Sequence, residues 1–361
     1  MSSTQEQIRL LVLLANGLLQ IYDQSLRGTS LSSPYPKSLQ QGMHKLAAHQ
    51  IEVGLNPITG IQDLLILVEH PLDTWKLNFD EEIVSQGEQL MERGIPTQFC
   101  LDWIHEQGPE ALEEETLLRE VMAICKETSR PDTYTAFRNL LICRPVLTTL
   151  ELQMAKQEST LRPVRDLLVK AYMPAPLSAT YNSAYGCCGR CGGLLLRTEG
   201  NQFECENERC WSSELTTGRT LSVEEGVLWL ENGLRRYVAR PGLAEIELQD
   251  RLESLGLSVE MWPNYDAYDL RVKINDAIWA VDVKDWSNPF KLAQSVGPIR
   301  RNPHWDRAFY VFPDDRKQKR PDYLRAFRNR WVKPAATKAM MLSDFVREVE
   351  RALRGENYAT D

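Results

Sequence analysis

The sequence lacks several features that would point directly to a function. No apolar run approaches the roughly 20 residues that a membrane-spanning helix needs, so no membrane partner is expected. No G-x-x-x-x-G-K-[ST] loop is present, so any ATP-driven motor must be another chain. A G-x-S-x-G serine motif is also absent. The five histidines show no metal-binding spacing. These absences exclude transporters, P-loop motors and serine hydrolases of that type.

The start of the chain and its composition indicate a globular protein. Residues 1–20 lack a basic leader and a small-residue cleavage site, so we expect no signal peptide and a cytoplasmic location. Apolar residues make up 43% and charged residues 25% of the 361 residues, which is typical of such proteins. Residues 235–361 carry 23 Lys and Arg against 19 Asp and Glu, a charge of +4, which leaves −12 for the rest of the total of −8. If the chain meets nucleic acid, the basic part is the better candidate, although drift of surface charge also explains this contrast.

The pattern of apolar residues predicts a multidomain fold. Residues 1–172 have apolar positions three and four apart and predict an all-α N-terminal domain. A Pro-, Ser- and Ala-rich linker over 173–186, a small cysteine unit over 187–212 and a connecting helix over 213–240 are expected next. Residues 241–361 alternate between helical and strand-like segments and predict an α/β domain with a mixed sheet. Helices expected in the N-terminal domain include 8–23, 38–55, 60–70, 81–94 and 110–129.

Five of the eight cysteines lie close together, between residues 187 and 210. The spacings Cys188-x2-Cys191 and Cys205-x4-Cys210 present two pairs of thiolates, which suits tetrahedral Zn²⁺ in a zinc ribbon. A pair of disulfides is disfavoured in a cytoplasmic chain. Cys187 is an alternative ligand to Cys188, although Cys188 fits the knuckle spacing better. Because four protein ligands leave no room for water, this zinc is expected to be structural.

Charged residues interrupt two strand-like segments that otherwise read as buried. If Asn275 and Asp276 form a two-residue hairpin turn, Asp269 lies directly opposite Asp282, and alternation places Lys284 on the same face. Two opposed carboxylates repel each other, and a divalent cation between them removes the repulsion. With a nearby lysine, this is equipment for metal-assisted phosphodiester hydrolysis. A D-x-K triplet alone is a weak signal and is also compatible with a solvated surface pair.

These residues and the helix before them resemble the PD-(D/E)xK nucleases, the restriction-endonuclease-like superfamily. The resemblance covers about residues 241–333 and departs at Tyr268, where the motif often has proline. Glu245 and Glu247 are two apart in the preceding helix, so at most one points at the site, and Glu245 matches the first-helix acid. The resemblance implies that two carboxylates bind Mg²⁺ or Mn²⁺ and that the lysine assists attack by water on DNA. It implies four catalytic residues: Glu245, Asp269, Asp282 and Lys284.

A narrower resemblance extends over more of the chain. The segment "GIPTQFCLDWIHEQGPE", the cysteine unit and "AVDVKDWSNPFKLA" together resemble the nuclease that accompanies pPIWI-RE proteins, which are bacterial Argonaute-like proteins. This resemblance implies a role in defence against phages or plasmids. It also implies protein partners, namely a helicase and the Argonaute-like protein.

A basic segment near the C-terminus is a candidate DNA-binding surface. Its Lys and Arg residues alternate with Tyr323, Phe327 and Trp331 and could neutralise phosphates; a helix with a solvated basic side is the simpler alternative. Because cutting both strands often requires two active sites, a homodimer is possible. The competing function is a non-catalytic DNA-binding or scaffold subunit with a nuclease-like fold. The candidate DNA-binding residues are Arg316, Lys317, Lys319, Arg320, Arg325 and Arg328.

Overall fold

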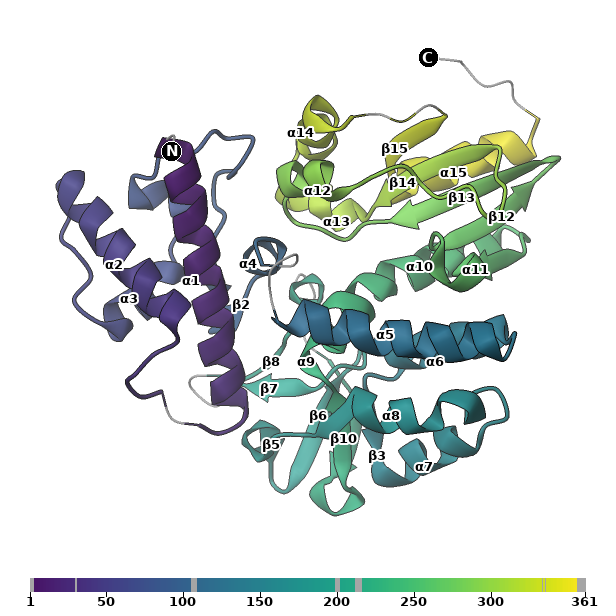
Figure 1. The fold of residues 1–361 in the computed structure, drawn as a ribbon, viewed down its shortest axis with the longest axis horizontal. Coiled ribbons are helices and arrows are strands. Elements are labelled where there is room, and N and C mark those ends of the chain that lie inside the picture. The colour runs from purple at the N-terminus through teal and green to yellow at the C-terminus, as the bar shows by residue number, and fades with distance from the viewer. Residues whose placement is uncertain are drawn as a thin grey trace. The chain divides into compact units, whose positions relative to one another are not determined.

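The computed structural model describes residues 3–29, 31–104, 109–198, 202–211, 216–332, 334 and 336–355. Contacts group the chain into two compact units, whose elements are labelled in Figure 1. The first unit comprises Met1–Ala111 and Pro174–Glu224, and the second comprises Leu112–Met173 and Glu225–Asp361. Within the described part of the chain, no helix has the length and apolar character that crossing a membrane requires.

The N-terminal part of the first unit is helical, as predicted. The close packing of the first two helices depends on Gly17, because a Cβ there would lie 2.6 Å from the Cα of Leu39. The helical elements are α1 (Ser3–Leu26), α2 (Lys37–Glu52), α3 (Ile61–Val68), the 3-10 helix η1 (Leu72–Trp75) and α4 (Gln98–Asp102).

The helix expected over residues 81–94 is wrong. The chain forms turns there, followed by a short hairpin of β1 (Met91–Glu92) and β2 (Ile95–Pro96). Gly87 and Gly94 have φ angles of +84° and +73°, in the left-handed region that favours glycine. These two residues break the helix that the spacing of apolar residues suggested.

The rest of the first unit consists of short strands around the cysteines. Two strands begin within the linker expected over 173–186, so this part of the segment contributes to the sheets of the unit. Tyr185 is buried, and its hydroxyl donates to the carbonyl of Ala175 at 3.0 Å, which fixes this segment to the unit. The strands form sheets β5-β6-β9 and β7-β8. Their bounds, with those of the 3-10 helices, are η3 (Leu177–Ala179), β5 (Thr180–Tyr181), β6 (Ala184–Cys188), β7 (Leu195–Arg197), β8 (Phe203–Cys205), η5 (Glu208–Cys210), β9 (Thr217–Ser222) and η6 (Val223–Glu225).

The second unit begins with helices that pack on a small sheet, β3-β10-β4. The connecting helix expected over 213–240 is wrong where strands β9 and β10 form. The apolar run "VLWL" of β10 pairs with β3 after a left-handed Gly226 (φ +64°). A short apolar run has no period that separates a strand from a helix. The elements are α5 (Pro109–Glu127), α6 (Pro131–Cys143), β3 (Val146–Thr148), α7 (Thr149–Gln157), η2 (Arg162–Val164), α8 (Arg165–Ala171), β4 (Tyr172–Pro174), β10 (Val227–Leu230), α9 (Asn232–Leu234), the π-helix η7 (Arg235–Ala239) and α10 (Arg240–Ser254).

A five-stranded mixed sheet completes the second unit and confirms the predicted α/β character of this region. Its order is β11-β12-β13-β14-β15, antiparallel up to β13 and parallel from β13 to β15. Helices α10 and α15 pack on one face, and α12 and α14 pack on the other. The elements are β11 (Val259–Met261), α11 (Pro263–Asp266), β12 (Leu270–Ile274), β13 (Ala277–Val283), α12 (Pro289–Ser295), β14 (Arg307–Phe312), α13 (Asp314–Lys319), α14 (Tyr323–Arg330), β15 (Thr337–Met341) and α15 (Leu342–Leu353).

The predicted hairpin register is confirmed between β12 and β13. The five residue pairs run from Ile274 opposite Ala277 to Leu270 opposite Val281. Asn275 turns the chain with a φ of +53°, a conformation that asparagine tolerates. This register fixes where the charged residues at the open end of the hairpin lie.

Candidate functional site

Asp282 and Lys284 lie at the carboxyl end of β13. The Nζ of Lys284 donates to Oδ1 of Asp282 at 2.8 Å, and both side chains are only partly exposed. Asp282 is also paired, in the parallel register, with Tyr310 of β14. Burial alone lowers the pKa of Lys284, but the carboxylates of Asp282 and Asp269 outweigh it, so the pKa is raised. The lysine therefore holds its proton at neutral pH in the metal-free protein.

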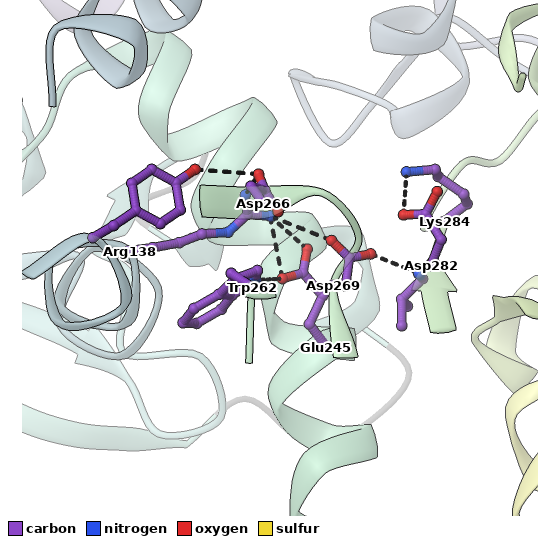
Figure 2. A network of polar contacts seen from close by, with 9 residues as sticks. Arg138, Glu245, Trp262, Asp266, Asp269, Asp282 and Lys284 are labelled. Carbon is purple, nitrogen blue, oxygen red and sulfur yellow. Dashed lines mark hydrogen bonds and ion pairs between the residues drawn. The ribbon is translucent and has the colours of Figure 1, made fainter. Parts of the chain in front are cut away.

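Asp269 lies one residue before β12, at the position that the register places opposite Asp282. Its side chain is buried, and its Oδ2 accepts the backbone N–H of Val283 at 2.6 Å. Burial, then the nearby charges of Glu245 and Asp282, raise the pKa of Asp269 well above its ordinary value. Figure 2 shows Asp269 between the Asp282–Lys284 pair and a second group of polar residues.

Glu245 belongs to that second group and extends from the buried face of α10. Its Oε2 accepts the indole N–H of Trp262 at 2.5 Å, and the Nη2 of Arg138 reaches its two oxygens at 2.9 and 3.2 Å. Burial raises the pKa of Glu245, and Arg138 opposes that rise. Glu247 lies on another face and pairs with Arg251 at 2.8 Å. Of the two helix acids, Glu245 is therefore the one beside Asp269.

Arg138 on α6 is a member of this group that the sequence reasoning missed. Its Nη1 pairs with Asp266, and its Nη2 lies 3.8 Å from Oδ1 of Asp269 as well as contacting Glu245. Tyr134, one turn earlier on α6, donates to Asp266 at 3.2 Å. The sequence feature that could have revealed Arg138 is an arginine on the apolar stripe of an amphipathic helix. Such a cation needs an acidic partner elsewhere in the fold.

The segment before Asp269 has an unusual backbone. Trp262, Asn264, Tyr265 and Asp266 have φ angles of +48°, +49°, +59° and +71°, which side chains other than those of Asn and Asp rarely adopt. This left-handed turn places the Trp262 indole on Glu245 and the Asp266 carboxylate on Arg138. The backbone N–H of Trp262 also donates to the carbonyl of Asp269 at 2.7 Å. The turn thus connects the two acids of the polar group with the start of β12.

The charges of this site do not balance. Two cations, Arg138 and Lys284, face four carboxylates, so the formal charge is −2 when all six groups are counted as ionised. Three of these side chains, those of Arg138, Glu245 and Asp269, are buried, where unbalanced charge is costly. A divalent cation bound by carboxylate oxygens matches this deficit in sign and size. The carboxylates are Glu245, Asp266, Asp269 and Asp282.

The four predicted cysteines of the zinc ribbon are brought together in the first unit. The Sγ atoms of Cys188, Cys191, Cys205 and Cys210 all lie within 4.8 Å of one another. In the described part of the chain this is the one group of three or more potential ligands packed so tightly. A tetrahedral site with Zn–S bonds of about 2.3 Å has S···S separations of about 3.8 Å, so the residues fit zinc. Cys187 lies outside the cluster, which decides the alternative between Cys187 and Cys188.

The loops around the cysteines have the geometry of a metal knuckle. Gly192, directly after Cys191, has a φ of +70° and donates its N–H to the carbonyl of Cys188 at 2.9 Å. On the other side, the N–H of Asn207 points at the Sγ of Cys205 at 3.4 Å, and the Trp211 indole donates to the Cys205 carbonyl at 2.7 Å. The cluster can therefore hold a metal such as zinc.

The basic segment is divided between buried and exposed residues. Arg316 and Arg320 are buried, and they pair with Asp285 at 2.7 Å and Asp322 at 3.1 Å. Their assignment to DNA contact is therefore corrected, since a buried guanidinium cannot meet a phosphate. The remaining four candidates have exposed side chains, although Arg328 donates to the carbonyl of Ala339 at 2.7 Å. The exposed residues are Lys317, Lys319, Arg325 and Arg328.

The comparison with protein families gives two matches. Residues 242–357 match the family described as REase associating with pPIWI_RE. Residues 10–148 match the family described as pPIWI_RE three-gene island domain Y. No curated protein and no solved structure matches the chain. The first match contains all the acids of the polar site, and the second contains Arg138.

Proposed function

Because the chain carries a REase-like domain tied to pPIWI_RE systems, as the narrower sequence resemblance indicated, we propose that it is a divalent-metal-dependent DNA endonuclease. The observation that carries the proposal is the group of four carboxylates, with Glu245 and Asp269 buried, beside a lysine at the open end of the β12–β13 hairpin. Asp269 and Asp282 hold Mg²⁺ or Mn²⁺, and Glu245 orients the site from α10. This arrangement suits hydrolysis of a phosphodiester bond.

The residues divide the chemistry between them. The bound ion supplies Lewis acidity and lowers the pKa of water, as metals do in phosphodiester hydrolysis. Lys284 is held by Asp282 at 2.8 Å and, as an ammonium, stabilises negative charge that develops on the phosphate. Glu245 is held by Arg138 and Trp262, so its carboxylate has a fixed position beside Asp269.

The exposed basic residues support DNA as the substrate. Helix α13 begins directly after β14, which runs parallel to β13, so α13 starts at the same edge of the sheet as Asp282 and Lys284. Lys317 and Lys319 on α13 and Arg325 on α14 have exposed side chains, and in this proposal they hold the phosphate backbone. Residues that bind phosphates without reading bases would give affinity without sequence preference.

The two family matches support a role in a prokaryotic defence system that acts on phage or plasmid DNA. In this proposal the chain works with an Argonaute-like protein and a helicase, because it has no P-loop of its own. Zn²⁺ on the four cysteines serves structure, since no ligand position is left for water. Two copies of the chain could cut the two strands of a duplex.

The proposal is tested by plasmid nicking in Mg²⁺ or Mn²⁺, with the purified chain alone and with the other proteins of its system. Asp282→Asn should abolish cleavage, because it removes a metal-binding charge while keeping the side chain's size. Asp276→Asn is the matched control, since Asp276 is an exposed residue in the turn of the same hairpin. If Asp282→Asn nicks DNA at the wild-type rate, the assignment of the site is wrong.

The alternative, a non-catalytic DNA-binding or scaffold subunit, has one observation in its favour. Arg138 already places a protein cation against Glu245 and near Asp269. A binding subunit would shift DNA on a gel equally well in EDTA and in Mg²⁺ and would never cut it, even with all the proteins of its system present. Cleavage that requires the metal excludes this alternative.

A further inference from the structure

Arg138 joins two parts of the sequence that match different families. It lies on α6, within residues 10–148, and its acidic partners lie within residues 242–357. The residue is 9% exposed, and Glu245 follows it by 107 positions. Both belong to the second unit, so the contact is part of one compact fold.

The shape of the guanidinium explains why an arginine is found here. One of its terminal nitrogens bonds both oxygens of Glu245, while the other pairs with Asp266. A planar group with several fixed donors can hold two carboxylates in different directions, whereas a lysine ammonium is a compact point charge. Arg138 therefore ties α10 to the left-handed turn at Trp262–Asp266.

This turn needs support from outside because its backbone is strained. The supporting contacts come from α5 and α6: the Tyr265 hydroxyl donates to the carbonyl of Cys125 at 3.2 Å, and Tyr134 and Arg138 hold Asp266. Strained conformations persist where the surroundings hold them, and they are frequent at functional sites. Since the turn ends three residues before Asp269, its support also fixes where β12 and that carboxylate begin.

Arg138 also determines the charge that remains for a metal. With Arg138 the formal charges of the six groups, each counted as fully ionised, sum to −2, which one divalent ion neutralises. Without it the sum is −3, and Glu245, Asp266 and Asp269 lose the cation that they share. Hard divalent cations bind such carboxylates readily.

We propose that Arg138 is a positioning residue and the permanent cation of this site, which holds Glu245 and the Trp262–Asp266 turn and offsets one of the negative charges around the metal. This inference rests on the proposed nuclease function and names a residue that acts through the metal-binding carboxylates. It means that residues 242–357 lack a part of the working site, which the domain Y-like segment supplies.

Manganese binding to the full-length chain tests the proposal without DNA. The protein is freed of loosely bound ions by gel filtration and titrated with Mn²⁺, with the free ion followed by electron paramagnetic resonance. Wild-type protein should bind one ion, and Asp282→Asn should bind it at least tenfold more weakly. Arg138→Met should bind the ion at least threefold more tightly, because the carboxylates then carry one more uncompensated negative charge. Its melting temperature should fall by roughly 10 °C without metal, the scale expected for a broken buried ion pair, and recover with Mn²⁺.

Two further variants complete the experiment. Arg130→Met is the matched control, because Arg130 precedes the same helix and forms an exposed pair with Asp132; it should behave as wild type. Arg138→Lys keeps the positive charge, and it tests the proposal if Arg138→Met does not fold. It should bind one Mn²⁺ and lower kcat at least tenfold with little change in KM, because a point charge cannot hold both carboxylates.

The outcomes separate the two proposals. Wild-type protein that binds Mn²⁺ but cuts no DNA in the complete system would count against the nuclease function. Equal Mn²⁺ affinity in wild type and Arg138→Met would overturn the role of Arg138 alone. Wild-type kcat in Arg138→Lys would overturn it as well.

Discussion

Replacement of Arg316 by methionine should reveal whether this residue is structural or binds DNA. Arg316 on α13 pairs with Asp285 through Nε and Oδ1 at 2.7 Å, and the two side chains are 2% and 4% exposed. Asp285 directly follows Lys284, so the pair fastens α13 to the end of the segment that carries the candidate site. Methionine fills a similar volume and leaves the buried Asp285 carboxylate without the guanidinium.

The expected cost follows from this burial. Removing one partner of a buried ion pair destabilises a protein by about 3–5 kcal/mol. In a unit of this size each kcal/mol lowers the melting temperature by roughly 2–4 °C. Arg316→Met should therefore melt roughly 6–20 °C below wild type, as measured by calorimetry. The double variant Arg316→Met/Asp285→Asn should regain part of this loss, because the buried charge is gone.

Lys317 offers a matched control, since it is the next residue and its side chain is exposed. Lys317→Met should leave the melting temperature within about 1 °C, because surface substitutions cost little. If Lys317 contacts a phosphate, its loss should reduce the salt slope of DNA binding by about 0.9. The reasoning is refuted if Arg316→Met melts like wild type and weakens DNA binding as Lys317→Met does.

Two further predictions concern the zinc cluster and the buried acid. Cys205→Ser should lose nearly all bound zinc by elemental analysis and unfold the ribbon, because zinc binding is coupled to folding; full zinc content would contradict the four-cysteine site. Burial, then Glu245 and Asp282, raise the folded-state pKa of Asp269 above its ordinary 3.8, so in metal-free buffer ionisation opposes folding as pH rises through that range. The free energy of unfolding, measured by urea denaturation, should therefore rise in Asp269→Asn relative to wild type between pH 4 and pH 7. A difference between the two proteins that does not change with pH would contradict this.

The hairpin could be predicted from the sequence because its information is local. Asn275 and Asp276 specify a tight turn, and alternation along two short strands then places each residue on a face. The cysteine cluster was predictable for the same reason, since the spacing of each pair defines a knuckle. The spacing of Glu245 and Glu247 showed only that at most one of them faces the site, and it was the family resemblance that selected Glu245.

The missed features depend on contacts between distant segments. Nothing near Arg138 in the sequence indicates an acidic partner 107 residues away. Arg316 belongs to a basic segment whose sequence predicts a solvated surface. Only the fold shows that Arg316 forms an ion pair with Asp285. Strand β15 is short and rich in Met, Lys and Thr, a composition that does not predict a strand. Only its pairing with β14 shows that this segment is one.

The order of the chain delays the completion of the second unit during synthesis. Helix α6 emerges early, and residues 174–224 of the other unit follow before α10 and the sheet are made. At about 5–20 residues per second, the ribosome needs roughly 5–20 s to reach Glu245 after Arg138. During that interval the apolar face of α6, including Phe137 and Leu141, lacks the later elements η7 and α10 that pack against this helix. The nascent chain is therefore exposed to aggregation at this stage, and slower translation would lengthen the exposure.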